Sequence, residues 1–388
     1  MRRRPLFLFA LGAALTLTTV ACSGGSRPEV TNKSVDPTQT SGEPASSTPD
    51  SGAPQPFNAY EFTQANELAD SVKDIPERVY VPNGESNTVT VIDPATFQIL
   101  ETFPVAKLPQ HVVPDYSMQT LYVNNNVGNT LTPIVARTGE RLPDIPIDDP
   151  YNLYFSPDGT KAIVMAERNN QVDFYDPNSW SLIKHLDIPH AGVNHAEFSP
   201  DGKTMIASCE FSGYLVRINL DTMELTGSLN IGGKPVDLKL SPDGSVVYNA
   251  NETRDGISIV DWQSPEMKEV QFIPTGDGTH GLYPSRNGKQ LYITNRLGGS
   301  ISILDFATNQ IVDEWSTGGP NESSPDMGGV STDGTQFWIS GRYNSEVYVI
   351  DTRTGDLITT IDVGKGPHGL AYFPQPGRFS MGHTGNYR

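Results

Sequence analysis

Cysteine is nearly absent from this chain and occurs only as Cys22 and Cys209. Cys22 follows an apolar N-terminal run, so Cys209 is the one thiol of the remaining chain, and a single thiol excludes an intramolecular disulfide framework. Basic residues are also scarce, because 27 Lys and Arg oppose 45 Asp and Glu, for a formal net charge of −18 at pH 7. Since no basic stripe interrupts this acidic composition, we expect no nucleic-acid partner.

Several motifs of catalysis and cofactor binding are missing as well. The chain has no Gly-x-Ser-x-Gly nucleophile motif, no Cys-x-x-Cys-His segment for covalent haem and no phosphate-binding loop. The sequence therefore favours a protein that is not an enzyme, and it names no certain cofactor.

Long apolar runs are missing except at the N-terminus. Three arginines at positions 2–4 precede an apolar run over residues 6–20, which is too short for a comfortable membrane span and has signal-peptide flanks. Small residues before Cys22 resemble the bacterial lipobox. The resemblance implies removal of residues 1–21, lipid attachment to Cys22, and an exported protein anchored to the cell membrane, facing the periplasm or the exterior. The alternative is an ordinary secretory signal with an incidental cysteine.

The next part of the chain lacks the residues that build a core. Residues 22–57 are rich in Ser, Pro, Thr and Gly, a composition that cannot bury enough apolar surface to offset the entropy of ordering. We expect a disordered tether here. Residues 58–77 are mixed in composition and are interpreted as an N-terminal strap before the folded domain, residues 78–388.

A repeated unit dominates residues 78–388. It begins with a turn such as Ser199-Pro200-Asp201-Gly202, followed by an apolar strand, a polar turn, an alternating strand closed by Asp, and a fourth strand. Equivalent turns lie at residues 156–159, 241–244, 285–288 and 331–334, and alternating strands at 88–93, 257–261, 301–305 and 347–351. Asp-Gly and Asn-Gly between alternating apolar runs predict β-hairpins. Four short strands in a little over forty residues predict the blades of a β-propeller.

One strand carries a family resemblance. Leu291-Tyr292-Ile293-Thr294-Asn295 nearly spells Tyr-Val-Thr-Asn, and the chain resembles the YVTN-repeat, YncE-like family of surface-layer and periplasmic seven-bladed propellers. The resemblance implies an all-β propeller with four antiparallel strands per blade. It says little about function, because this scaffold serves many roles.

Seven inner strands can be counted, and the last of them, residues 368–373, has no complete blade behind it. Since residues 78–81 already read as a second strand, we expect the C-terminal inner strand to complete the N-terminal blade, which removes sheet edges. Residues 378–382 also have the pattern of a second strand. The pattern does not decide which of the two segments is displaced.

Ligands of propellers lie where the inner strands begin, at the mouth of the central channel. Alignment of the inner strands on their turns gives two rows of residues at this mouth. One row is His111, Asn152, His195, Asp237, Gly281, Met327 and Gly369, and the other is Gln110, Tyr151, Asn194, Val236, His280, Asp326 and His368. His111, His195, His280 and His368 are therefore candidate ligands of a transition metal such as Zn, Cu or Fe, or proton-transfer groups. Polar residues that merely line a funnel are the alternative.

The position of each histidine along its inner strand limits this hypothesis. His111 and His195 are one residue out of step with His280 and His368, and successive strand residues point to opposite faces. If that alternation persists to the strand tip, only two of the four can share a direction. The remaining candidate ligand-binding residues are polar positions of the rows, of the loops between second and third strands, and of the tail: Asp237, Asp326, Asn152, Glu167, Glu210, Arg296, Arg342 and His383.

Three functions follow from these patterns. The favoured one is a membrane-anchored propeller that recognises an envelope protein, a glycan or a small molecule at its channel face. The second is a metal-dependent enzyme or metal carrier that uses the histidines, and the third is a structural envelope protein. Imidazoles that converge on one point within bonding distance would distinguish the second function from the others.

Overall fold

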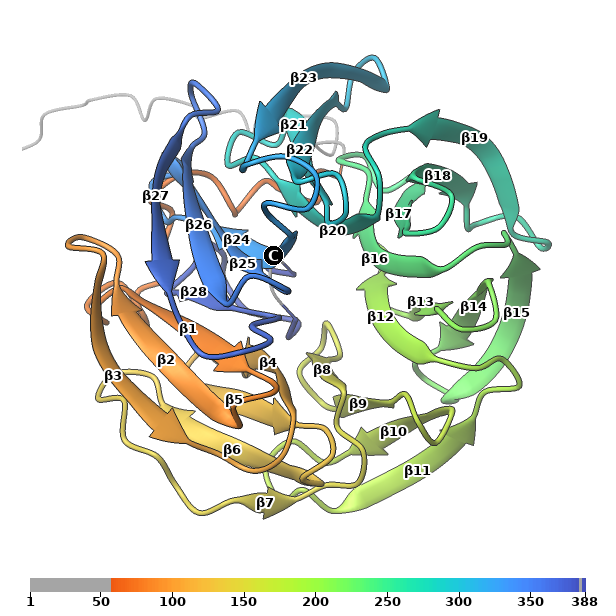
Figure 1. Cartoon of the computed structure of the whole chain (residues 1–388). Helices are drawn as coiled ribbons and strands as arrows, with labels where there is room; N and C mark the ends of the chain where they lie inside the picture. The colour runs from red at the N-terminus through yellow and green to blue at the C-terminus, as the bar shows by residue number, and fades with distance from the viewer. Residues whose placement is uncertain (1–56, 384–385) are drawn as a thin grey trace, which may run out of the picture. The chain divides into compact units, whose positions relative to one another are not determined.

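The computed structural model describes residues 57–383 and 386–388, which form 28 β-strands and no helix. The strands build seven sheets of four, and these sheets surround a common centre as the blades of a propeller (Figure 1). Within the described residues, no helix has the length and apolar character needed to cross a lipid bilayer. The expected all-β, seven-bladed architecture is confirmed. The predicted signal peptide and Cys22 lie outside the described residues, as does the predicted tether except for Phe57.

Each blade runs from an inner strand at the centre to an outer strand at the rim (Figure 1). Blade 1 is β28 (Ala371–Phe373), β1 (Arg78–Asn83), β2 (Thr88–Asp93) and β3 (Gln98–Pro104); blade 2 is β4 (Pro109–Pro114), β5 (Thr120–Asn125), β6 (Thr130–Val135) and β7 (Ile145–Pro146). Blade 3 is β8 (Asn152–Phe155), β9 (Ala162–Ala166), β10 (Gln171–Tyr175) and β11 (Leu182–Asp187); blade 4 is β12 (Val193–Phe198), β13 (Thr204–Cys209), β14 (Tyr214–Asn219) and β15 (Glu224–Asn230).

The remaining three blades follow the same order. Blade 5 is β16 (Pro235–Leu240), β17 (Val247–Asn251), β18 (Gly256–Asp261) and β19 (Lys268–Pro274). Blade 6 is β20 (Thr279–Pro284), β21 (Gln290–Asn295), β22 (Ser300–Asp305) and β23 (Gln310–Ser316). Blade 7 is β24 (Pro325–Val330), β25 (Gln336–Gly341), β26 (Glu346–Asp351) and β27 (Leu357–Asp362).

Blade 1 joins the two ends of the propeller. β28 pairs antiparallel with β1, so that Arg78 lies opposite Phe373 and Tyr80 opposite Ala371. The C-terminal strand therefore completes the N-terminal blade as expected, and the closure removes an exposed sheet edge. The second strand of this blade is β1, whereas residues 378–382 belong to no blade.

The turn motif of the sequence has a clear structural role. In the turn after β8, the Ser156 hydroxyl donates to Asp158 Oδ1 at 2.5 Å, and the same oxygen accepts the Thr160 amide at 3.0 Å. Gly159 follows with φ +70°, a conformation that glycine adopts without strain. The Ser199 and Asp201 side chains repeat this bond at 2.6 Å, so the motif fixes each inner hairpin locally.

Apolar burial holds the blades against one another. The inner strands β4, β12, β16 and β24 are buried over their whole length, whereas the outer strand β15 alternates between exposed and partly buried residues. Cys209 lies in the apolar cluster between blades 3 and 4 and is 0% exposed. Burial raises the pKa of its thiol to about 12, so this cysteine is an inert core residue.

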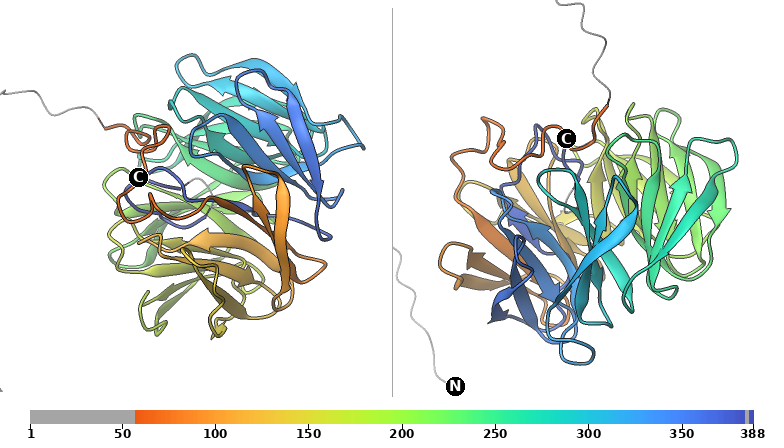
Figure 2. Two further views of the ribbon diagram at one scale, coloured as in Figure 1. Left: turned by 90° about the vertical axis from the view of Figure 1, so that its left-hand side faces the viewer. Right: turned by 90° about the horizontal axis from the view of Figure 1, so that it is seen from above.

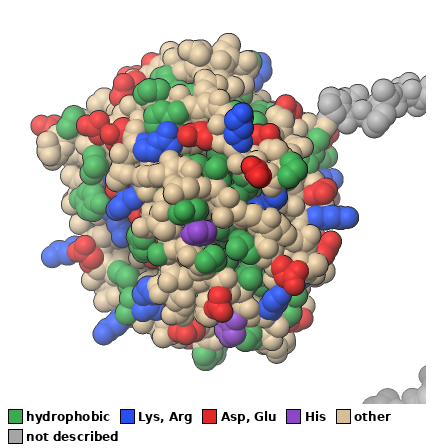
Figure 3. All heavy atoms as spheres, turned by 90° about the vertical axis from the view of Figure 1, so that its right-hand side faces the viewer, with side chains coloured by type: hydrophobic (Ala, Val, Ile, Leu, Met, Phe, Trp, Pro, Cys, Tyr) green, Lys and Arg blue, Asp and Glu red, His purple; other side chains and the backbone are tan. Residues whose placement is uncertain are grey.

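The propeller has two different ends. We call the end formed by the loops between second and third strands the mouth face, and the end formed by the Ser-Pro-Asp-Gly turns the tail face. The strap, residues 58–77, crosses the tail face: the Ala59 amide donates to Pro242 O, and the Asn66 amide donates to Thr332 O. Figure 2 shows the strap and the C-terminus on the same side of the propeller. On the outer surface in Figure 3, acidic and basic side chains are interspersed.

Candidate metal centre

The inner strands are irregular where they border the channel. Pairing with the second strand shifts by one residue between Pro109 and Val112 in β4, between Val193 and His195 in β12, and between Thr279 and Leu282 in β20. Such bulges interrupt the alternation of side chains and re-aim them. The alternation of side-chain direction therefore does not persist to the tip of these strands. Both rows of aligned residues, the one with His111 and the one with His280, contribute side chains to the channel.

Five imidazole rings form one continuous cluster in this channel. The ring centroid of His111 lies 4.8 Å from that of His368, 5.0 Å from that of His383 and 5.7 Å from that of His195. His280 joins at 5.9 Å from His368. The four histidines predicted as ligands thus lie together, and His383 lies with them.

Within this cluster, three histidines face one another. One ligating nitrogen from each of His111, His195 and His383 lies within 4.8 Å of the others, and all three residues are 0% exposed. Among residues 57–383 and 386–388, their Nε2 atoms have no hydrogen-bond partner. A buried polar atom without a partner costs free energy unless something else binds it. We call these residues the His triad.

The Nδ1 atoms of the triad fix the tautomers. His111 Nδ1 lies 2.9 Å from Tyr151 O, and His195 Nδ1 lies 2.9 Å from Asn194 Oδ1. Both partners are acceptors, so each Nδ1 carries the hydrogen and each Nε2 presents a lone pair. His383 Nδ1 instead lies 3.1 Å from Asn152 Nδ2, an amide donor, so its hydrogen is on Nε2 in this arrangement.

His280 and His368 contact the carboxylate of Asp326, although the His368 ring also lies beside that of His111. Asp326 Oδ2 lies 2.5 Å from His368 Nδ1, and Asp326 Oδ1 lies 3.2 Å from His280 Nδ1 and 3.2 Å from Arg296 Nη1. The Tyr151 hydroxyl lies 3.2 Å from His368 Nε2. Asp326 therefore organises a second polar group directly beside the His triad.

Burial keeps the imidazoles neutral. Desolvation is the largest cause that lowers the pKa of His111, His195 and His383 well below the usual value, and the neighbouring imidazoles and basic side chains lower it further. The triad is therefore neutral at pH 7. Neutral imidazole is the form that binds a metal ion.

Two other predicted residues, Asp237 and Asn152, lie in the channel wall beside the triad. Asp237 accepts the amides of Leu238 and Leu282 at 2.9 Å each, and its Oδ1 lies 3.7 Å from His383 Nε2. Burial raises the pKa of Asp237. Asn152 contacts His383 as described above, so both predicted residues support the triad.

Carboxylates predominate on one side of the mouth face. Asn194 donates to Glu167 Oε1 at 3.1 Å and to Glu210 Oε2 at 2.7 Å. Burial raises the pKa of Glu167 to about 8, and the nearby charge of Glu210 also raises it, although the bond from Asn194 lowers it. On the other side, Arg296 pairs with Glu252 at 2.7 Å.

The raised pKa of Glu167 predicts a pH-dependent stability. Between its ordinary pKa of 4.5 and about 8, folded Glu167 holds a proton that the unfolded chain lacks. Stability relative to Glu167→Gln therefore falls as pH rises through this window, by up to about 1.4 kcal/mol per pH unit. Urea unfolding of both proteins at pH 5, 6, 7 and 8 measures the difference. A constant difference across these pH values would contradict the assignment.

Sequence reasoning did not select several residues that line the site. Tyr151 and Asn194 stand in the aligned rows but were not chosen as candidates. Lys239 and Glu197 are 0% exposed on inner strands. Lys239 lies two positions after Asp237, and Glu197 lies two positions after His195, each on a buried strand. Residues two positions apart on a strand face the same side, so this spacing was the sequence signal that could have identified Lys239 and Glu197.

Comparisons with known proteins agree with this fold. A family model described as "YNCE-like beta-propeller" matches residues 59–376. Among curated proteins, none matches the chain significantly in sequence. His383 lies beyond the matched residues.

Several solved structures resemble the chain. A functionally unknown protein from Desulfotomaculum acetoxidans DSM 771 is 16% identical with a TM-score of 0.66, covering 76% of this chain and 98% of that one. A putative 6-phosphogluconolactonase from Bacteroides fragilis NCTC 9343 is 17% identical with a TM-score of 0.62, covering 78% and 99%. A hydrazine synthase chain from Kuenenia stuttgartiensis is 19% identical with a TM-score of 0.61, covering 71% and 92%. At such identities, these likenesses establish the fold alone.

Proposed function

The chain belongs to the YNCE-like β-propeller family, and from this premise we propose that it is a metal-binding propeller whose channel holds one transition-metal ion between His111, His195 and His383. The family scaffold leaves function to the residues placed on it. Two observations carry the proposal: one nitrogen of each buried triad ring lies within 4.8 Å of the others, and the three Nε2 atoms have no hydrogen-bond partner among the described residues.

The donor set favours particular metals. Three imidazoles suit Zn²⁺ or Cu²⁺, and not Mg²⁺ or Ca²⁺, which prefer oxygen ligands. At Zn–N distances of about 2.1 Å, tetrahedral ligand nitrogens lie about 3.4 Å apart. The triad nitrogens are within 4.8 Å of one another, so binding requires the rings to move inward by roughly an ångström at the longest separation.

Metal binding also requires a lone pair on His383 Nε2. Rotation of the Asn152 amide would bring Oδ1 to His383 Nδ1, which would then carry the hydrogen. The Tyr154 hydroxyl, 3.3 Å from Asn152 Nδ2, can donate to the oxygen in that orientation. The cost is two bonds: the one that the Leu153 amide donates to Asn152 Oδ1 at 2.9 Å, and the one that Asn152 Nδ2 donates to Asn194 O at 3.4 Å. Asn152 is thus the residue that sets the tautomer of the third ligand.

The burial of the triad favours a carrier over an enzyme. Catalytic zinc sites keep one coordination position open to substrate, whereas all three ligands here are 0% exposed. The signal and lipobox features of residues 1–22 support export and membrane anchoring through Cys22, which we include in the proposal. The protein would then hold its metal ion outside the cytoplasm.

Elemental analysis tests the function directly. Purified protein is incubated with Zn²⁺ or Cu²⁺, desalted and compared with His111→Ala and with His190→Ala, a matched control. The His190 ring stacks on Tyr214 at 3.8 Å, away from the triad. We expect about one ion per chain in the parent and in His190→Ala, and at least a hundredfold weaker binding in His111→Ala. A metal-free parent, or equal retention in both variants, would rule out the His triad.

A second candidate function is recognition of an anionic ligand at the mouth face. Arg342 is half-buried there and has no ion-pair partner among the described residues; its Nη1 atom lies 3.5 Å from Gln110 Oε1. A parent protein without metal would leave this candidate as the function to pursue.

A further inference from the structure

The three ligands of the proposed centre come from two kinds of element. His111 lies on β4 and His195 on β12, and each of these strands is held in a four-stranded sheet. His383 instead lies beyond β28 and beyond the family match, in residues 378–388. We call this segment, as far as it is described, the C-terminal hairpin. Ser380 pairs with Tyr387, and the Met381 amide donates to Asn386 O at 2.8 Å.

The C-terminal hairpin enters the channel from the tail face. The Phe155 amide donates to Met381 O at 3.0 Å, and the His383 amide donates to Leu153 O at 3.1 Å. These two bonds run along β8 and carry His383 inward to Asn152. The hairpin thus adds a short piece of chain to blade 3 without being one of its strands.

Buried charges hold the base of the hairpin. Lys239 Nζ donates to Asn386 Oδ1 at 2.5 Å, and Arg388 Nη2 donates to Glu197 Oε1 at 2.9 Å. Lys239 and Glu197 are 0% exposed. These polar contacts could be exchanged for water if the hairpin left, because each partner would then be solvated.

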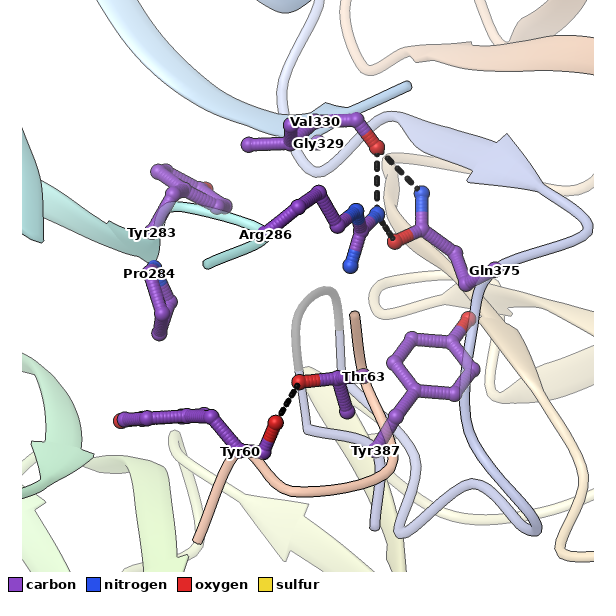
Figure 4. A pocket seen from close by; sticks show the side chains of 9 residues that line it. All are labelled: Tyr60, Thr63, Tyr283, Pro284, Arg286, Gly329, Val330, Gln375 and Tyr387. Atoms are coloured by element: carbon purple, nitrogen blue, oxygen red, sulfur yellow. Dashed lines mark hydrogen bonds between the residues drawn. The ribbon is translucent and has the colours of Figure 1, made fainter. Parts of the chain in front are cut away.

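The tail face is hollowed around the hairpin, where a pocket of about 330 Å³ is lined partly by Phe379, Met381 and Arg388 of the hairpin. Beside the hairpin lies a cavity of about 20 Å³ lined by Tyr60 of the strap, Tyr387 of the hairpin and Arg286, as Figure 4 shows. A cavity of this size holds about one water molecule. The triad itself is 0% exposed while the hairpin is seated, so an ion reaches it only after part of the surrounding wall has moved.

The hairpin is the ligand-bearing element that can move at least cost. Displacing β4 or β12 would break ladders within blades 2 or 4. The hairpin belongs to no such ladder: it is held by an isolated bridge with Tyr154, by the bonds described above, by bonds from Asn386 Nδ2 to Ala196 O and from the Ser380 amide to Tyr116 O, and by the buried side chains of Met381 and Tyr387. We propose that the C-terminal hairpin is a metal-controlled latch, which leaves the channel to admit the ion and is held in place by the ion through His383. This inference rests on the proposed metal-binding function.

Linkage makes the proposal quantitative. If seating of the hairpin raises the metal affinity by some factor, bound metal must favour the seated hairpin by the same factor. Since one of three ligands depends on seating, we expect a factor of about 10 to 100. The metal affinity and the opening of the hairpin are therefore two measurements of one quantity.

Hydrogen exchange on the full chain in detergent tests the latch. Peptides that cover residues 377–388 are followed with and without saturating Zn²⁺, and peptides from β14 serve as internal controls. We expect Zn²⁺ to slow exchange of the hairpin amides about 10- to 100-fold and to leave β14 unchanged. In His383→Ala, the hairpin exchange is expected to be independent of Zn²⁺, while His190→Ala behaves as the parent.

The outcomes separate the latch from the metal site. If Zn²⁺ binds with dependence on His111 but the hairpin exchanges equally in both states, the latch is wrong and the proposed function stands. If the parent binds no metal, both fail. Protection that persists in His383→Ala would also overturn the latch, because the ion would then act through another residue.

Discussion

Replacement of Asp326 by alanine is expected to destabilise the folded protein by about 3–5 kcal/mol. Asp326 is 0% exposed and contacts Arg296, His280 and His368. Burial alone would raise its pKa, but His368, His280 and Arg296 hold the pKa well below its usual range. The carboxylate is therefore ionised. Its loss leaves the guanidinium of Arg296 in the channel wall without one of the negative charges that compensate it.

Asp326→Asn is the matched control, because it keeps the shape and one hydrogen-bond acceptor but removes the charge. We expect it to cost less than the alanine variant, since Asn Oδ1 can still accept from His368. Urea unfolding at pH 7 gives both free energies. An alanine variant within about 1 kcal/mol of the parent would mean that Asp326 does not organise the channel.

Truncation after Pro367 is expected to abolish cooperative folding. This change removes β28, whose pairing with β1 closes the ring. It also removes four buried apolar side chains from the clusters on either side of blade 1: Leu370, Ala371, Tyr372 and Phe373. Loss of these side chains costs roughly 5–10 kcal/mol, comparable to the total stability of a domain.

A chain truncated after Gly377 is the control, because it keeps β28 and loses the C-terminal hairpin. We expect this chain to unfold cooperatively in urea and to bind Zn²⁺ more weakly, whereas the shorter chain shows no cooperative transition. Circular dichroism during urea titration measures both. Equal unfolding midpoints for the two chains would show that ring closure does not depend on β28.

The fold was predictable from the sequence because its signals are local and repeated. Each Ser-Pro-Asp-Gly turn forms hydrogen bonds within a few residues, as Ser156 and Asp158 do, so the turn types and strand order are encoded in short segments. Closure through β28 also followed from counting strands. The competition between residues 78–83 and 378–382 could not be resolved in this way, because both segments have the same alternating pattern.

The site was predictable only in part. The sequence selected His111, His195, His280 and His368 because they recur at equivalent positions of different blades. It did not divide them between the His triad and Asp326, because that division depends on bulges in the inner strands. A bulge shifts side-chain direction by one residue, which a strict alternation does not anticipate.

By itself, the sequence determined the acidic, cysteine-poor composition, the repeated blades and the histidines at the channel. Only the tertiary structure decided that His383 completes a triad with His111 and His195 and that Asp326 holds the other two. The physical reason is the range of the interactions. Turns and strands arise from contacts between near neighbours in the chain, whereas the triad joins residues 84, 188 and 272 positions apart, and only closure of the whole ring brings such residues within ångströms of each other.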